Sequence, residues 1–280
     1  MARCDVCFHH CEIPEGRRGF CGARTCADGK VVAGNYGRIT ALALDPIEKK
    51  PLRCFHPGSM VLSVGSYGCN LRCPFCQNHE ISWSAEAMAY ADRAETLTPE
   101  ALAEMAVRLK PRGNLGLAFT YNEPLVGWEF VRDAARLTHE AGLLNVLVTN
   151  GTAELQILEQ IAPFVDAMNI DLKGFTEHYY TQVLGGSLEM VKAFIERTVQ
   201  QCHVELTTLI VPSENDSEDE IRALSRWVAG LKGGWTIPLH ISRFFPRFHM
   251  LDRPATEVRT VYHLADVARE TLRNVYTGNC

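Results

Sequence analysis

The chain has 280 residues, 46% of them hydrophobic, enough for one large domain with its own core and a small accessory segment. The net charge of −5 gives no reason to expect a nucleic-acid partner. No apolar run reaches the roughly 18 residues of a membrane span, and the N-terminus lacks an apolar signal core, so we expect a cytoplasmic protein without a membrane partner. Eleven cysteines in such a protein favour metal ligation over disulfides.

Cysteines crowd the first part of the chain, and we take residues 1–54 as a cysteine-rich N-terminal segment. Four of them are predicted to ligate one metal centre, either zinc or a second iron–sulfur cluster, because thiolates suit both: Cys4, Cys7, Cys11 and Cys21. Cys26 and Cys280 are further candidates or spare thiols, and Cys54 and Cys202 are predicted to be ordinary buried thiols. The pair Lys49-Lys50 is typical of a solvated surface.

A second cysteine group follows the short apolar strand predicted over 60–65. Cys69, Cys73 and Cys76 form a C-x3-C-x2-C loop, which offers three thiolates. A four-iron cluster held by three cysteines keeps one iron without a protein ligand, where a small molecule can coordinate and receive an electron. Phe75 offers a flat surface on which a planar base can stack. The alternative is a zinc knuckle completed by Cys54 or His79.

Strands and helices are predicted to alternate after residue 54. Predicted strands cover 60–65, 115–120, 143–148, 165–170, 204–211 and 237–241, and predicted helices cover 98–109, 125–140, 152–162, 187–200, 217–231 and 256–272. Thr98 is expected to cap one helix, and Ser217 with Glu220 to form a capping box on another. Six strand–helix units indicate an α/β fold, either a parallel barrel or a doubly wound sheet.

Polar side chains fall where the predicted strands end, the edge at which parallel-sheet enzymes build their sites. The candidates are Tyr121, Asn122 and Glu123 after the second strand, Asn150 after the third, Asp171 and Lys173 after the fourth, and His240 within the sixth. Glu123 can accept a charge-assisted hydrogen bond from an ammonium group. Thr207 and Thr208 receive only a weak role, since threonine is ordinary in strands.

The string CNLRCPFC at residues 69–76 resembles the signature of the radical S-adenosylmethionine (SAM) superfamily. This resemblance implies a partial (β/α)6 TIM-like barrel over residues 55–280, with a 4Fe–4S cluster on Cys69, Cys73 and Cys76. It implies that SAM chelates the open iron and is cleaved to a 5'-deoxyadenosyl radical. TYNEP resembles the GGE-type motif that holds the methionine amino group, which points to Glu123.

Asp171, Lys173 and His240 are similar to cofactor-contacting positions of glycyl-radical-enzyme activases, of which the pyruvate formate-lyase activating enzyme is one. Over nearly the whole chain, the ordered strings VTNG, NIDLKGF, TTLIVPSEND, HISRFFP and VYTGN resemble the AmmeMemoRadiSam system radical enzyme. The resemblance implies a protein or peptide substrate, Memo-like and AMMECR-type partners, and a flavodoxin- or ferredoxin-type electron donor. The alternatives are a glycyl-radical activase and a non-catalytic iron–sulfur or zinc protein that senses redox state.

Overall fold

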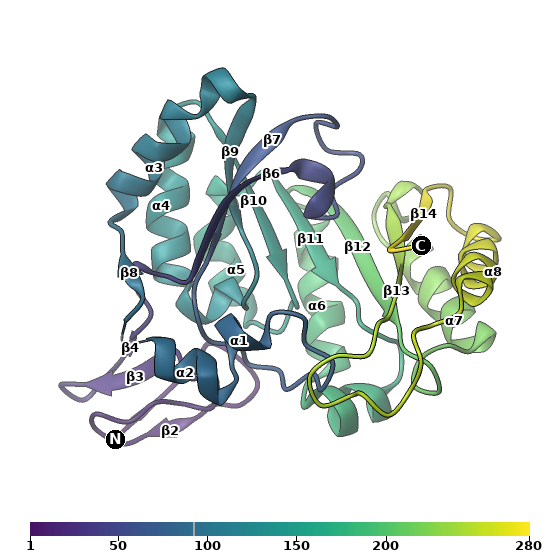
Figure 1. Cartoon of the computed structure of the whole chain (residues 1–280), viewed down its shortest axis with the longest axis horizontal. Coiled ribbons are helices and arrows are strands. Elements are labelled where there is room, and N and C mark those ends of the chain that lie inside the picture. Colours follow the sequence, from purple (N-terminus) through teal and green to yellow (C-terminus); the bar gives the residue numbers. More distant parts are fainter. Residues whose placement is uncertain (92) are drawn as a thin grey trace.

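The computed structural model describes residues 1–91 and 93–280 and is built around one eight-stranded sheet. The spatial order is β14-β13-β12-β11-β10-β9-β7-β6, and neighbouring strands are parallel from β14 to β7. The strands are β6 Ala41–Pro46, β7 Met60–Gly65, β9 Asn114–Phe119, β10 Leu144–Thr149, β11 Ala167–Asp171, β12 His203–Ile210, β13 Leu239–Arg243 and β14 Val275–Gly278. The sheet curls into an open arc with β6 and β14 at its edges (Figure 1).

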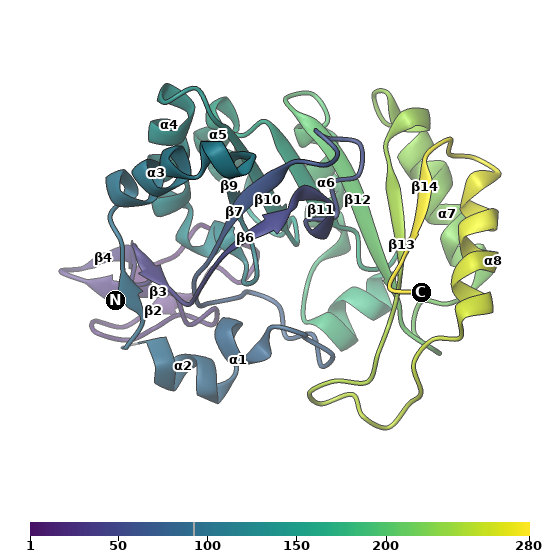
Figure 2. The same cartoon turned by 45° about the horizontal axis from the view of Figure 1, so that its top comes forward.

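Helices cover the outer face of this arc, as Figures 1 and 2 show. They are α3 Pro99–Arg108, α4 Trp128–Glu140, α5 Leu155–Ile161, α6 Leu188–Thr198, α7 Glu218–Ala229 and α8 Val258–Arg269. Central strands such as β10 and β12 are almost continuously buried, which is the pattern of parallel strands covered on both faces. The predicted α/β partial barrel is therefore confirmed, together with each of its six predicted strand–helix units.

Helix caps show one difference from the prediction. Thr98 accepts a hydrogen bond from the Ala101 N–H at 3.2 Å and caps α3 as expected. Ser217 likewise caps α7 through the Glu220 N–H. The Glu220 carboxylate does not complete a capping box, because it accepts a hydrogen bond from the Phe175 N–H at 2.6 Å instead. This contact ties α7 to the loop that follows β11.

Two edge strands were not expected from the sequence. β6 lies within the predicted N-terminal segment yet runs antiparallel along β7, pairing Leu42 with Val64. β14 follows α8 and pairs in parallel with β13. The proposed boundary at residue 54 therefore falls after a strand of the main sheet. Both strands end up in the sheet because their neighbours present free backbone groups, a condition that only the tertiary arrangement supplies.

The remaining short elements gather at one end of the sheet (Figure 1). They are β1 Ala2–Arg3, β2 Glu12–Ile13, β3 Arg24–Ala27, β4 Lys30–Ala33, β5 Arg38–Ile39, β8 Glu95–Thr96, α1 His79–Ser82 and α2 Ala85–Ala91. The arrows of β10 and β11 point toward this end, so it carries the strand C-termini. Among the helices that the structure describes, none has the length and apolarity needed to cross a membrane.

Candidate active site

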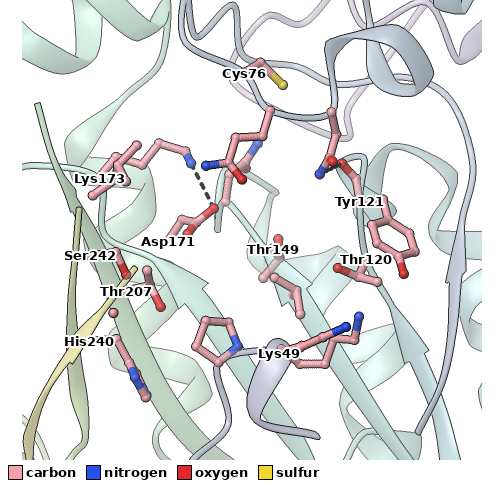
Figure 3. Close-up of a pocket in the computed structure, with 18 of the residues that line it drawn as sticks. Lys49, Cys76, Thr120, Tyr121, Thr149, Asp171, Lys173, Thr207, His240 and Ser242 are labelled. Carbon is pink, nitrogen blue, oxygen red and sulfur yellow. Dashed lines mark hydrogen bonds and ion pairs between the residues drawn. The ribbon is translucent and has the colours of Figure 1, made fainter. Parts of the chain in front are cut away.

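A pocket of about 850 Å³ opens at the C-terminal ends of the strands and extends along the inner face of the sheet. Its size lies within the range of small-molecule sites. Every residue predicted for the first cluster and its cofactor lines it: Cys69, Phe75, Cys73, Cys76, Tyr121, Asn122, Glu123, Asn150, Asp171, Lys173 and His240. Figure 3 shows Cys76 at one end of the pocket, with His240 and Lys49 at the other.

The cysteine loop, residues 66–78, is fixed by hydrogen bonds to distant segments. The Asn70 side chain donates to the Thr152 carbonyl at 2.8 Å, and Asn150 donates to Asn70 at 2.9 Å. The Leu71 N–H donates to the Cys69 sulfur at 3.5 Å. Burial raises the pKa of Cys73 to about 11, so a free thiol here stays protonated and a thiolate needs a metal.

Glu123 is buried, with 3% of its surface exposed, and supports the neighbouring strand end. One carboxylate oxygen accepts hydrogen bonds from the Leu125 N–H at 3.0 Å and the Thr149 hydroxyl at 2.7 Å. The other accepts from the Asn150 N–H at 2.8 Å, which leaves it further acceptor capacity. Burial raises the pKa of Glu123 to about 7, so a cation placed beside it would be strongly favoured.

Asp171 and Lys173 form an ion pair of 2.8 Å on the pocket wall, drawn as the dashed line in Figure 3. Burial lowers the pKa of Lys173, but the Asp171 carboxylate outweighs this effect and the net pKa rises. Lys173 therefore stays charged. The pair presents both a cation and a carboxylate to the pocket, which suits a ligand carrying groups of both signs.

Three other residues that were predicted to contact the cofactor also contact other parts of the protein. The Asn122 side chain holds the Ser66 N–H and the Gly68 carbonyl, so it shapes the cysteine loop. The Tyr121 hydroxyl donates to Asp45 at 2.8 Å. Phe75 is 5% exposed and meets Phe244 edge to face at 6.1 Å. These residues line the pocket, and their contacts with other residues also hold the pocket walls in place.

Glu205 is a feature that the sequence reasoning missed. It is fully buried in β12, and its carboxylate accepts from His240 at 2.7 Å and from His203 at 3.0 Å. It also accepts the backbone N–H groups of Arg53 and Cys54 at 3.0 and 2.7 Å. Burial raises its pKa, but the hydrogen bonds from His203 and His240 outweigh that and bring it to about 2. The available signal was a glutamate inside an apolar strand.

Two expectations about individual side chains were wrong. Lys50 is buried at 3% exposure, where it pairs with Asp45 at 2.9 Å and lies over the Tyr121 ring. It was expected on the solvated surface, but the carboxylate and the ring compensate its burial. Cys54 was expected to be buried and is exposed, with its sulfur 3.3 Å from the Tyr276 hydroxyl.

The alternative zinc knuckle draws no support from this arrangement. Cys54 lies beside Tyr276 of β14, and the His79 ring stacks on Phe248 at 4.1 Å. Over residues 1–91 and 93–280, no three His, Cys, Asp or Glu side chains gather closely enough to hold one metal ion in common. The sulfurs that hold a four-iron cluster do not have to meet at one ion, because each cysteine binds a separate iron.

The residues present fit a thiolate-bound cluster with an amino-acid ligand. Soft thiolates from Cys69, Cys73 and Cys76 suit iron–sulfur chemistry and line the same pocket as the other groups. The buried Glu123 suits an ammonium, and Asn150 offers both a donor and an acceptor. The buried polar wall thus matches a ligand that carries an amino group and hydroxyl groups.

Comparisons with known proteins agree with this geometry. The family model described as the radical SAM superfamily matches residues 63–225. An uncharacterized protein of Methanocaldococcus jannaschii is 39% identical over 99% of this chain and 81% of its own length. The pyruvate formate-lyase-activating enzyme of Clostridium pasteurianum is 27% identical over 59% of this chain and 68% of its own.

Among solved structures, Streptococcus suis SuiB bound to S-adenosylmethionine superposes with a TM-score of 0.58 at 13% identity, covering 79% of this chain and 52% of SuiB. At that identity the likeness concerns the fold alone, and this chain spans about half the length of SuiB. The chain therefore belongs to the radical SAM superfamily, whose cofactors are a 4Fe–4S cluster and S-adenosylmethionine.

Proposed function

We propose that this protein is an enzyme that binds its 4Fe–4S cluster through Cys69, Cys73 and Cys76 and abstracts hydrogen from a residue of a protein or peptide. When bound, the cluster supplies one electron that cleaves S-adenosylmethionine and releases the 5'-deoxyadenosyl radical. The observation that carries the proposal is that these three thiols share one pocket with Glu123 and the Asp171–Lys173 pair.

The protein's own groups have distinct roles in this proposal. Glu123 binds the methionine ammonium, because its buried carboxylate has no cation beside it among the described hydrogen-bond partners. Asn150 contacts the ribose or the carboxylate of the cofactor, Asp171 accepts from the ribose hydroxyls, and Lys173 adds a positive charge at the carboxylate. Phe75 contributes an apolar surface near the cluster. Each role depends on a side chain that lines the pocket.

We propose that His240 lies at the end of the pocket where the substrate binds. The sequence had suggested a contact with the cofactor instead. It lies far from Cys76 in Figure 3 and is held by Glu205. Lys49 and Arg53 line the same region, so the far end carries exposed cationic groups. A peptide entering there would meet polar and charged side chains, while its reacting atom would extend toward the cysteine loop.

The reaction on the substrate has two candidate outcomes. The likeness to a pyruvate formate-lyase-activating enzyme favours a protein substrate and keeps the glycyl-radical activase as the second candidate. A stable backbone radical on a partner enzyme, seen by electron paramagnetic resonance, would support the activase. A closed-shell modified side chain found by mass spectrometry would contradict it. The Memo-like and AMMECR-type partners and a flavodoxin- or ferredoxin-type donor stay predictions.

The test is an anaerobic assay of 5'-deoxyadenosine with reduced protein and S-adenosylmethionine. Wild type is expected to form the product, whereas Cys73→Ala is expected to lose it because the cluster loses one of its ligands. Cys202→Ala is the matched control, since its sulfur lies after α6 and away from the pocket lining. Continued cleavage by Cys73→Ala would show that the cluster is bound elsewhere.

A further inference from the structure

Four cysteines outside the proposed active site form a group of their own near the N-terminus. Cys4, Cys7 and Cys21 are buried, Cys11 is partly buried, and none is in a disulfide. Cys4 follows β1 and Cys11 precedes its partner β2, where the Cys4 N–H donates to the Cys11 carbonyl at 2.9 Å; Phe20, the neighbour of Cys21, donates its N–H to the Cys11 sulfur at 3.4 Å. The chain thus brings together thiols that are separated by up to 17 positions in the sequence.

Backbone N–H groups donate to two of these sulfurs, as one does to the Cys69 sulfur. The Cys21 sulfur accepts a hydrogen bond from the Arg24 N–H at 3.4 Å. The Cys69 sulfur accepts one from the Leu71 N–H at 3.5 Å. The Cys11 sulfur accepts from the Phe20 N–H at 3.4 Å. Such hydrogen bonds stabilise negatively charged, metal-bound sulfur and tune the potential of iron–sulfur clusters.

A buried cation lies beside this group. Arg24 is 5% exposed, and its guanidinium pairs with Glu129 at 2.7 Å. Within the described part of the chain, its Nε atom is buried without a hydrogen-bond partner. A buried donor left unpaired is costly, and a cluster with anionic sulfurs would supply an acceptor for it.

The cysteine group is joined directly to the cysteine loop of the active site. The Cys69 N–H donates to the Cys21 carbonyl at 3.1 Å. The ring of His9, two positions after Cys7, lies 2.9 Å from the Asn70 carbonyl. A single hydrogen bond therefore separates the backbone of a ligand in one group from the backbone of a ligand in the other.

We propose that Cys4, Cys7, Cys11 and Cys21 bind a second iron–sulfur cluster, which accepts one electron from a donor protein and passes it to the cluster on Cys69, Cys73 and Cys76. The donor is oxidised by one electron and the active-site cluster is reduced by one, so the second cluster returns to its starting state. The binding of this cluster stands independently of the proposed function, whereas its relay role rests on it.

The binding test uses the full chain with the active-site ligands removed, as Cys69→Ala/Cys73→Ala/Cys76→Ala. After anaerobic reconstitution this triple variant is expected to retain about four irons and four sulfides per chain, against about eight of each in wild type. Adding Cys11→Ser to the triple variant is expected to remove them. Adding Cys26→Ser is the matched control, because the Cys26 sulfur belongs to the same segment but contacts Glu15 at 3.3 Å.

A triple variant without bound iron would overturn the proposal, and so would one zinc ion per chain in place of iron. If the triple variant holds iron while wild type cleaves no S-adenosylmethionine, the second cluster stands and the proposed function fails. The relay is tested with Cys4→Ser/Cys11→Ser in the otherwise intact chain. This variant is expected to lose cleavage driven by a reduced flavodoxin and to keep cleavage driven by dithionite. Equal loss with both reductants would refute the relay.

Discussion

The buried carboxylate of Glu205 provides the sharpest test of how the pocket is built. Each of its two oxygens accepts one backbone N–H and one imidazole nitrogen. In Glu205→Gln, one oxygen becomes an NH2 group, whichever way the amide is turned. That NH2 group then faces a backbone N–H from residue 53 or 54, and two donors cannot satisfy each other.

The loss of stability expected for Glu205→Gln follows from these contacts. An unsatisfied buried donor costs about 1–3 kcal/mol, and removal of one member of a buried ionic network costs about 3–5 kcal/mol. We therefore expect Glu205→Gln to lower the free energy of unfolding by about 3 kcal/mol, which corresponds to a decrease in Tm of about 6 °C or more. Glu189→Gln is the control, since Glu189 pairs with Lys192 at the surface, where ion pairs contribute about 0–1 kcal/mol.

The assay is thermal unfolding of the anaerobic protein, with wild type and both variants scanned at the same rate. The stability that Glu205 contributes is expected to decrease as the pH falls. The folded-state pKa of Glu205, about 2, lies below its ordinary value of 4.5, so its contribution is complete above pH 4.5 and is lost as the pH falls toward 2. The difference between wild type and Glu205→Gln should shrink over that range. A Tm change at pH 7 no larger than that of Glu189→Gln would refute this reasoning.

Three further changes test other parts of the structure. Gly68→Ala is expected to prevent loading of the active-site cluster, because residue 68 has φ +100° and a Cβ there would lie 2.5 Å from that of Ala23; a full iron content would contradict this. Glu123→Gln should raise the Kd for S-adenosylmethionine about tenfold or more at unchanged iron content, since a charge-assisted hydrogen bond is lost, and calorimetric titration measures it. Ser217→Ala removes the cap of α7 and should cost about 1 kcal/mol in chemical unfolding, whereas an unchanged midpoint would show that the cap contributes nothing.

The sequence by itself determined the alternation of strands and helices and the positions of the chemical groups. Apolar runs and caps are local signals, so β7 and β9 to β13 were located to within a few residues. The parallel order of the strands brings their C-terminal ends to one edge, and the predicted polar residues lie together there for that reason. The spacing of Cys69, Cys73 and Cys76 is likewise a local property of the chain.

Only the tertiary structure decided which groups lie against one another. The local signal of Glu205 is only that a glutamate stands in an apolar strand; its importance comes from backbone N–H groups more than 150 positions earlier in the chain. Lys50 looks like a surface residue until Asp45 and Tyr121 enclose it. The contact between Cys21 and Cys69 is of the same kind. Burial and long-range hydrogen bonds depend on how distant segments pack, and one segment read alone does not contain that information.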